Sequence, residues 1–262
     1  MKQPEHRSRV FASAWPGVYC TYIESGIHFG RHWHDTYGFG VMEQGGHRSA
    51  SGRGTVDAYA GDVITTNPGE VHDGRPQGAP ARRWRIVSVE RELMASITGA
   101  DAEITRPVIQ DRGLARILRR LFRRIEQRAD ALAAEESLVE SCALLMTRHG
   151  TARAVSEAPA DMRRVRERLA DGLAAAPSLA ELAAMTGLSR YQVLRRFQKV
   201  YGLPPHAWLM HERVERARRL ISQGSSLRDA AAGSGFADQS HMTRAFVRHF
   251  GFTPGAWRQA LQ

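Results

Sequence analysis

Two copies of a helix-turn-helix pattern, about fifty residues apart, constrain the last hundred or so residues of the chain more than any other feature. In the first copy, Ser178 is placed to cap a short helix, and Gly187 is placed to end it in a tight turn. Ser189 then caps a second helix, with Val193 and Phe197 on its inner side. The residues that would complete a capping box with the two serines are Glu181 and Gln192.

The second copy begins at Ser226, which caps another short helix, and turns at Gly235. Asp238 caps a helix predicted for residues 239–250, and Gly251 ends it. A single pattern of this kind is common in plain helical bundles, whereas two capped copies in a basic segment favour DNA binding. We therefore predict helix-turn-helix units at about 178–200 and 226–250.

A connecting helix is predicted from Pro205, which suits a first helical turn, to about Gln223. At 1.5 Å per residue it is roughly 25–30 Å long. One turn of DNA is ~34 Å, so two units joined in this way can enter successive major grooves on one face.

The charge of the chain is concentrated in the same region. Residues 1–150 contain 20 Lys and Arg against 18 Asp and Glu, whereas residues 151–262 contain 17 against 9. A basic segment beside a near-neutral one indicates a polyanionic partner, although a basic and inert surface is the alternative on charge alone.

Residues 17–90 have the sequence pattern of a β domain, because short apolar runs are separated by turn signals such as Gly45-Gly46 and Gly61-Asp62. This spacing predicts an antiparallel sandwich or barrel. Two amphipathic helices follow within residues 108–149. They either cap the β domain or pair with a second copy of the chain. The apolar stripe that motivates a dimer consists of Ile109, Leu114, Ile117, Leu121 and Ile125.

The expected organisation is α+β with two domains. A β-barrel with two trailing helices occupies residues 1–150, residues 151–160 form a linker, and residues 161–262 form an all-α domain with two helix-turn-helix units. No apolar run is long enough to cross a membrane and no signal peptide is evident, so we expect a cytoplasmic protein. Cys20 and Cys142 are expected to be buried free thiols.

Residues 161–262 resemble the AraC/XylS family of bacterial transcription regulators. The stretch 235–246 (GFADQSHMTRAF) with Gly251 to Pro254 is the most specific part, and Met242-Thr243 is a departure from it. The other residues that carry the resemblance are Ser189, Arg195, Phe197, Gly202, Pro204, Arg213, Ala217, Leu220 and Arg258.

The resemblance implies which side chains contact DNA, and their chemistry agrees. Arginine can bind guanine bidentately, glutamine can bind adenine, and methyl groups can contact thymine. The residues implied to contact bases are Arg190, Tyr191, Leu194 and Arg195 in the first unit, and Gln239, Ser240, Thr243 and Arg244 in the second. The residues better placed for phosphates are Arg196, Lys199 and Arg248.

The N-terminal segment resembles a cupin, and more narrowly the effector-binding domain of AraC-type regulators. His32, His34, Glu70 and His72 are the expected pocket residues. The three histidines are the candidate ligands if a metal binds, but Gly38-Phe39 stands where metal-binding cupins have a carboxylate. A metal-free effector pocket is therefore preferred, and no cofactor is expected.

These features predict a homodimeric transcription regulator that binds promoter DNA and a small-molecule effector, with RNA polymerase as a further partner. The alternatives are a metal-dependent cupin enzyme with an added helical domain, which leaves the doubled helix-turn-helix unexplained, and a constitutive DNA-binding protein whose barrel only dimerises.

Overall fold

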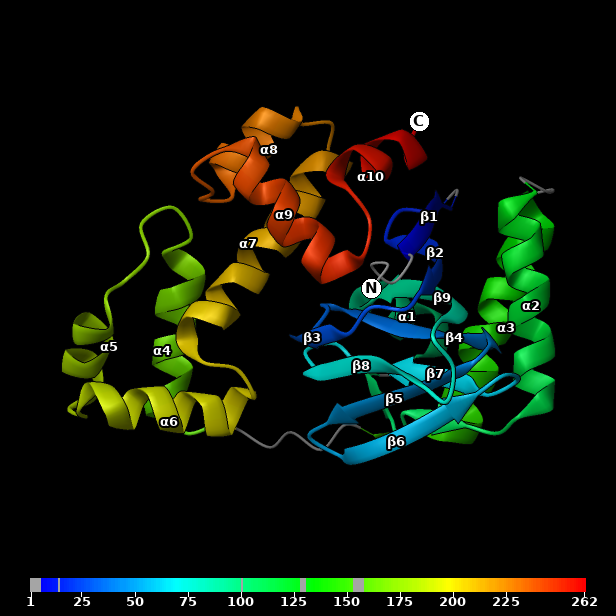
Figure 1. The fold of residues 1–262 in the computed structure, drawn as a ribbon, viewed down its shortest axis with the longest axis horizontal. Coiled ribbons are helices and arrows are strands. Elements are labelled where there is room, and N and C mark those ends of the chain that lie inside the picture. The colour runs from blue at the N-terminus through cyan, green and yellow to red at the C-terminus, as the bar shows by residue number, and fades with distance from the viewer. Residues whose placement is uncertain (1–5, 14, 100, 128–130, 153–157) are drawn as a thin grey trace. The chain divides into compact units, whose positions relative to one another are not determined.

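The computed structural model describes residues 6–13, 15–99, 101–127, 131–152 and 158–262. The chain forms two compact units, residues 1–154 and 155–260 (Figure 1). The first unit combines sheets and helices, and the described part of the second consists of helices and loops. This confirms the predicted two-domain α+β architecture. No helix in the described ranges is both long and apolar enough to cross a membrane.

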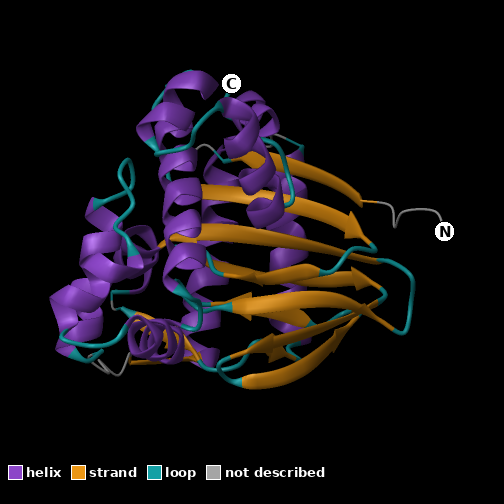
Figure 2. Ribbon diagram, turned by 60° about the vertical axis from the view of Figure 1, so that its left-hand side comes forward, coloured by secondary structure: helices purple, strands orange, loops and turns teal. Residues whose placement is uncertain are grey.

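The N-terminal unit is built on two antiparallel sheets (Figure 2). Apolar side chains from both sheets meet between them, since Ala58 of the smaller sheet packs with Met42 and Trp84 of the larger. The pairings between described residues do not close the sheets into one continuous barrel, so the cupin-like domain is a two-sheet sandwich. In sheet order, the larger sheet contains β1 (His6–Ala12), β2 (Val18–Ser25), β9 (Arg82–Glu90), β4 (Thr36–Gln44), β7 (Val63–Thr66) and β11 (Val108–Ile109). The smaller contains β3 (Phe29–His32), β8 (His72–Gln77), β5 (Gly46–Ser51) and β6 (Gly54–Tyr59).

Three helices, α1 (Arg91–Thr98), α2 (Arg112–Glu126) and α3 (Ala131–His149), pack on the outer face of the six-stranded sheet. Val87 and Val89 of β9 share one apolar core with Leu118 of α2 and Leu145 of α3. Strand residues alternate between two faces, so Trp84 and Ile86 of the same strand face the other sheet. Both cysteines are buried and unpaired, as expected.

The stripe that motivated a dimer interface lies inside the protomer. Leu114 and Leu121 are fully buried, and Ile109 and Ile125 are 3 % and 8 % exposed. Helix α2 uses this face to cover the sheet, which satisfies the apolar periodicity without a second chain. The hypothesis that this stripe forms the dimer contact was therefore wrong, although it leaves other faces of α2 and α3 available.

A small two-stranded sheet closes the N-terminal unit. Strand β10 (Ala102–Ile104) pairs with β12 (Gly150–Ala152), and Ile104 lies opposite Gly150. The predicted linker 151–160 is therefore too long at both ends, because Thr151 and Ala152 are in β12 and Ala160 begins the next helix. Linker residues 153–157 lie outside the described residues.

The C-terminal unit follows the predicted order of short helix, turn and second helix, twice over. Ser189 and Gln192 form a complete capping box, and Asp238 accepts a hydrogen bond from the backbone N–H of His241. Ser178 caps its helix through the N–H of Glu181, but the Glu181 carboxylate accepts a hydrogen bond from Arg168 instead of closing the box. The helices are α4 (Ala160–Asp171), α5 (Leu179–Thr186), α6 (Arg190–Tyr201), α7 (Pro205–Ser222), α8 (Leu227–Gly233), α9 (Gln239–Phe250) and α10 (Pro254–Ala260).

Candidate DNA-binding surface and effector pocket

Helix α6 presents polar side chains outward over a buried apolar face. Val193 and Phe197 are fully buried, whereas Tyr191 is 64 % exposed. The hydroxyl of Tyr191 accepts a hydrogen bond from Arg195 Nη1 at 2.9 Å, and the guanidinium lies 5.6 Å from the ring centroid. This contact pre-orients two of the expected base-contacting residues. The other expected contacts on this helix are exposed Arg190, Arg196 and Lys199 and half-buried Leu194.

Helix α9 has the same division of faces. Met242 and Phe246 are fully buried, while the other side of the helix is exposed or half-buried. The hydroxyl of Thr243 donates to the carbonyl of Gln239 at 2.8 Å, so this group is partly committed to its own helix. The exposed residues expected to contact DNA are Gln239, Ser240, Arg244 and Arg248.

Helix α7 joins the two helix-turn-helix units of the C-terminal unit as one rigid element of 18 residues, about 27 Å long. Its inner side buries Trp208, Leu209 and Ile221. It also carries a buried ion pair, in which Glu215 Oε2 accepts from Arg218 Nε at 2.9 Å. The other oxygen of Glu215 lies 3.4 Å from Nε2 of His249, so a polar contact in the core joins α7 to α9.

Gly235 occupies the turn before α9 and has no room for a side chain. Its φ is +78°, and a Cβ built there would lie 1.9 Å from the carbonyl oxygen of Leu173. Arg213 donates to that same oxygen at 2.9 Å, and burial lowers the pKa of Arg213. This close approach fixes the turn of the second helix-turn-helix unit against the segment that follows α4.

In the N-terminal unit, three of the expected pocket residues come together. The ring centroids of His32 and His72 are 4.4 Å apart, and His34 lies 5.0 Å and 5.5 Å from them. Nδ1 of His32 contacts the carbonyl of Gly30 at 2.7 Å, and Nδ1 of His72 contacts that of Glu70 at 2.9 Å. A carbonyl only accepts, so both Nδ1 atoms carry the proton and both Nε2 atoms are acceptors in the neutral rings. Burial lowers the pKa of His72 and favours its neutral form.

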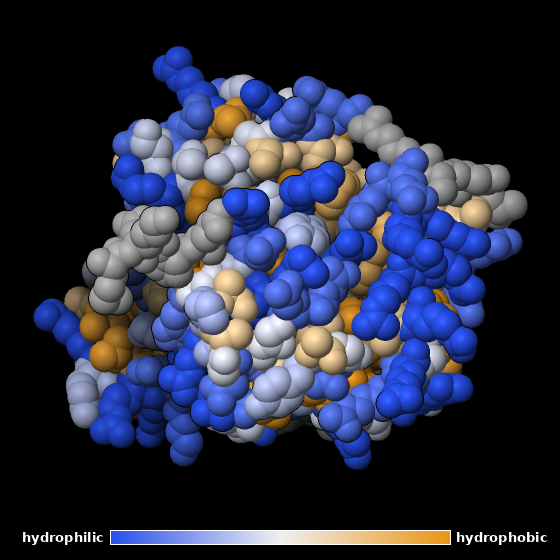
Figure 3. Space-filling model, turned by 45° about the vertical axis from the view of Figure 1, so that its right-hand side comes forward, coloured by the Kyte–Doolittle hydropathy of each residue, from blue (hydrophilic) through white to orange (hydrophobic). Residues whose placement is uncertain are grey.

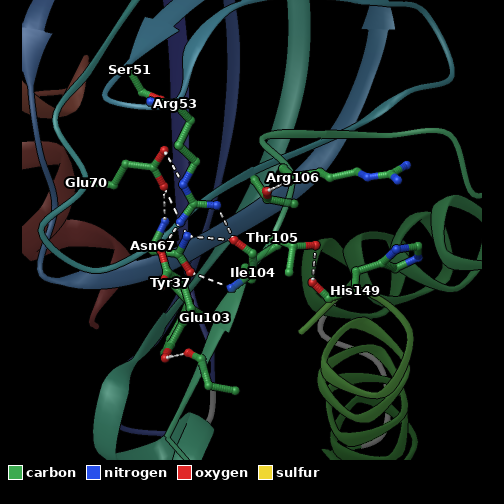
Figure 4. A network of polar contacts seen from close by, with 12 residues as sticks. Tyr37, Ser51, Arg53, Asn67, Glu70, Glu103, Ile104, Thr105, Arg106 and His149 are labelled. Atoms are coloured by element: carbon green, nitrogen blue, oxygen red, sulfur yellow. Dashed lines mark hydrogen bonds and ion pairs between the residues drawn. The ribbon is translucent and has the colours of Figure 1, made fainter. Parts of the chain in front are cut away.

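The side chain of Glu70 takes part in a different contact (Figure 4). Its Oε2 accepts hydrogen bonds from the backbone N–H and the side-chain amide of Asn67, and its Oε1 pairs with Arg53 at 3.5 Å. Asn67 in turn exchanges two hydrogen bonds with the backbone of Ile104, at 2.8 and 3.0 Å. The Glu70 carboxylate therefore holds Asn67 in place, and Asn67 holds the loop of residues 67–71, here called the pocket loop because it precedes the candidate pocket residue His72, against β10.

No carboxylate of the N-terminal unit, within its described ranges, joins the three histidines, whose candidate ligand atoms lie within 4.8 Å of one another. Phe39 is fully buried in the core under the helices. Gly38 lies on the opposite face of β4, where a Cβ would be 2.6 Å from the Thr66 hydroxyl. Ile86 packs against the apolar cluster between the sheets but is only half-buried, although its strand lies inside the sheet.

Comparison with known proteins covers both units. A family profile described as "AraC-like ligand binding domain" matches residues 16–141, and one described as "Helix-turn-helix domain" matches residues 182–260. The HTH-type transcriptional regulator YbfI of Bacillus subtilis is 29 % identical over 223 residues, which cover 82 % of this chain and 81 % of YbfI. The transcriptional activator NphR of a Rhodococcus species is 30 % identical over 193 residues, 69 % of this chain and 57 % of NphR.

Other relatives match a shorter part of the chain. The regulator MtrA of Neisseria gonorrhoeae is 32 % identical over 80 residues, 30 % of this chain and 27 % of MtrA. Among solved structures, apo ToxT K231A of Vibrio cholerae has a TM-score of 0.55 at 11 % identity and covers 98 % of both chains. That likeness shows a shared fold.

Proposed function

The chain belongs to the AraC family of DNA-binding transcriptional regulators with an N-terminal ligand-binding domain, and on this premise we propose that α6 and α9 are its two reading helices. The observation that supports this most directly is the pair of capped helix-turn-helix units joined by the rigid helix α7. In this proposal α6 contacts bases through Arg190, Tyr191, Leu194 and Arg195, and α9 through Gln239, Ser240, Thr243 and Arg244.

Three further cations are assigned to phosphates, which position a protein without specifying sequence. Lys199 and Arg248 are exposed in the last turns of their helices. Arg196 lies 3.5 Å from Asp161 of α4, an exposed pair that is worth little in water and can be exchanged for a phosphate.

Binding-site selection from random duplexes with the full-length protein tests this assignment. We expect one motif with two parts in successive major grooves, and affinity that falls steeply with salt. A footprint confined to one groove, or binding indifferent to sequence and salt, would contradict it.

We propose that the N-terminal sandwich binds the small-molecule effector between its sheets, with His32, His34 and His72 on one side of the site. The Nε2 acceptors of His32 and His72 suit hydroxyl or amide donors of a ligand. Glu70 supports the loop that carries His72. Replacing His72 with Phe should abolish the effect of effector on DNA affinity while leaving effector-free binding unchanged. A response equal to wild type would remove His72 from the site.

A metal-dependent enzyme is the second candidate, and the three neighbouring imidazoles are the observation that favours it. Three histidines leave an open position on a zinc or iron ion. The missing carboxylate and the homologous regulators lead us to prefer a metal-free site. Metal analysis of the purified chain should give substoichiometric zinc, iron, nickel and manganese. One equivalent, lost in a His72→Phe variant, would support the metal site.

We also propose that the regulator is a homodimer in the cytoplasm and contacts RNA polymerase at its promoters. The dimer contact is assigned to the outer faces of α2 and α3, where side chains are mainly hydrophilic (Figure 3). Val139 of α3 is 42 % exposed between Glu135 and Glu136 on one side and Glu140 on the other. Two-fold pairing would place Glu135 and Glu136 against basic residues of a second copy, whereas Glu140 already pairs with Arg120 of its own chain. The exposed basic residues of α2 are Arg112, Arg116, Arg119 and Arg123.

A double Arg116→Glu, Arg119→Glu variant should be monomeric and folded by light scattering and circular dichroism. An unchanged dimer would place the interface elsewhere.

A further inference from the structure

Arg82 is a buried arginine that crosses the space between the two sheets. It begins β9 in the larger sheet and is 1 % exposed. Its Nε donates to Nδ1 of His47 in the smaller sheet at 2.8 Å, and its Nη1 donates to the carbonyl of Ile27 at 3.0 Å. Its Nη2 is buried and has no hydrogen-bond partner among the described residues.

The positive charge of Arg82 has no counter-ion in the described part of the chain. Burial alone lowers its pKa to about 10, and no carboxylate contributes. The nearby carboxylate Asp57 forms two hydrogen bonds of 2.6 Å with Arg48 instead. The guanidinium of Arg82 lies 4.9 Å from the ring centroid of Trp84 and 5.7 Å from that of Phe29. Buried charges in proteins are normally paired, so this cation stands out as a group prepared for an anion.

His47 supplies a second donor beside it. Its Nδ1 accepts the bond from Arg82, so its proton lies on Nε2. Burial and the Arg82 cation lower the pKa of His47 to about 3, so the ring is neutral at physiological pH. A Cβ built on Gly74 would lie 3.1 Å from His47 Nε2 and 3.5 Å from Arg82 Nη2. Both donors therefore lie beside the α-carbon of Gly74, and a Cβ there would also lie 2.6 Å from His47 Cε1, so only glycine fits next to them.

One side of this donor pair is apolar. Trp84 packs with Ile23, Met42 and Ile64 between the sheets. Ile86, two positions along β9, packs against the same cluster and is only half-buried, so part of this apolar surface is accessible.

We propose that Arg82 and His47 bind the carboxylate of the effector, which is an organic monocarboxylate with a compact apolar body. Each donor takes one carboxylate oxygen, and the apolar part lies against Trp84 and Ile86. The proposal rests on the effector role assigned to the N-terminal unit. It narrows that role to anionic ligands, because a buried guanidinium gains most from an opposite charge.

The test uses the full-length protein and pairs of probes that differ only in charge: benzoate with benzamide, and hexanoate with hexanamide. Calorimetric titration and thermal shift should show saturable binding of at least one carboxylate and none of its amide. Arg82→Met should weaken that binding by about thirtyfold or more, as expected when one partner of a buried charge pair is removed. Arg48→Met, which removes an arginine from the same sheet region but outside the proposed site, should bind as wild type.

Gly74→Ala is the second variant, because the added methyl group displaces the His47 ring and should abolish binding even if Arg82→Met fails to fold. Failure of both carboxylates to bind, or equal binding to wild type and the folded variants, overturns the proposal. If amide and carboxylate bind alike and both change DNA affinity, the effector role stands and the anionic assignment falls. If the carboxylate binds through Arg82 but leaves DNA affinity unchanged, the site stands and its effector role falls.

Discussion

Replacing either turn glycine of the helix-turn-helix units with alanine should separate backbone strain from steric overlap. Gly187 and Gly235 both have left-handed backbone, with φ of +68° and +78°. A Cβ on Gly187 meets nothing within 4 Å, whereas one on Gly235 would lie 1.9 Å from the carbonyl oxygen of Leu173. Both variants therefore carry the cost of a left-handed alanine, but only Gly235→Ala also carries the cost of steric overlap.

The shared cost is the left-handed conformation of a residue with a Cβ, about 1–2 kcal/mol. Gly235→Ala must in addition move the Leu173 carbonyl or the turn by more than 1 Å, because Cβ contacts under 3.0 Å essentially never occur. That movement breaks the 2.9 Å bond from Arg213, worth about 1.5–3 kcal/mol, and overpacks the core at a similar cost. We expect Gly235→Ala to lose about 3 kcal/mol or more beyond the loss in Gly187→Ala.

Urea unfolding of the full-length variants, followed by hydrogen exchange resolved to peptides of α7 to α9, measures this difference in the C-terminal unit alone. Exchange in the N-terminal strands is the internal control and should not change. Equal losses in the two variants would refute the reasoning, because they would show that the approach to Leu173 carries no energetic cost.

Three other predictions concern separate parts of the molecule. Arg244→Ala should cost about 1–3 kcal/mol of specific binding free energy and relax base preference at one or two positions. Arg248→Ala should weaken binding to all sequences alike and reduce the slope of log affinity against log salt by about one. Selection on random duplexes distinguishes the two variants, and the opposite result would mean that α9 is oriented differently in the groove. Leu121→Glu should unfold the N-terminal unit, because it places a charge in a fully buried position; a folded monomer by circular dichroism and light scattering would contradict the burial. Asp111 caps α2 and contacts His149, and its hydrogen bond with the Leu114 N–H lowers its pKa to about 2. The contribution of this carboxylate to the free energy of unfolding is therefore present above about pH 4 and lost as the pH falls toward 2. Asp111→Ala should therefore cost about 1 kcal/mol at pH 7 and little at pH 2, and a gap that stays constant with pH would exclude the carboxylate charge as its source.

The helices of the C-terminal unit could be predicted closely because local chemistry sets their ends. The side chain of Ser189 or Asp238 satisfies backbone donors within its own turn, and a glycine such as Gly251 adopts the left-handed conformation that ends a helix. These signals lie within a few residues of each other, so sequence alone carries them.

Features that depend on contacts between distant parts of the chain were harder to predict from the sequence. Strand β1 alternates arginine with small and apolar residues at the edge of its sheet, and β10 and β12 have three residues each, too few for a periodic signal. The stripe on α2 was visible, but amphipathicity does not tell whether a sheet or a second chain covers it.

Buried polar groups escaped prediction for a related reason. His47 could be expected either to point inward or to lie on the surface, but its contact with Arg82, 35 residues away, has no local motif. Glu215 and His249 would have been placed on the surface by residue type, although Val214 and Ala217 beside Glu215 mark that side of α7 as a core position. The three neighbouring histidines were predicted because the cupin resemblance brought their segments together.

The short β10–β12 sheet makes the exit of the chain from the N-terminal unit part of the same mechanical linkage as the pocket loop. Asn67 is hydrogen-bonded through both its oxygen and its nitrogen to Ile104, and Ile104 lies opposite Gly150, the residue at which α3 gives way to β12. The backbone of Thr105 also donates to the carbonyl of His149 at 2.9 Å. A displacement of the loop before His72 must therefore either break these bonds or move β12, the strand that precedes the linker. Under the proposed effector role, a movement at His72 would thus be transmitted through only a few hydrogen bonds to the end of the N-terminal unit.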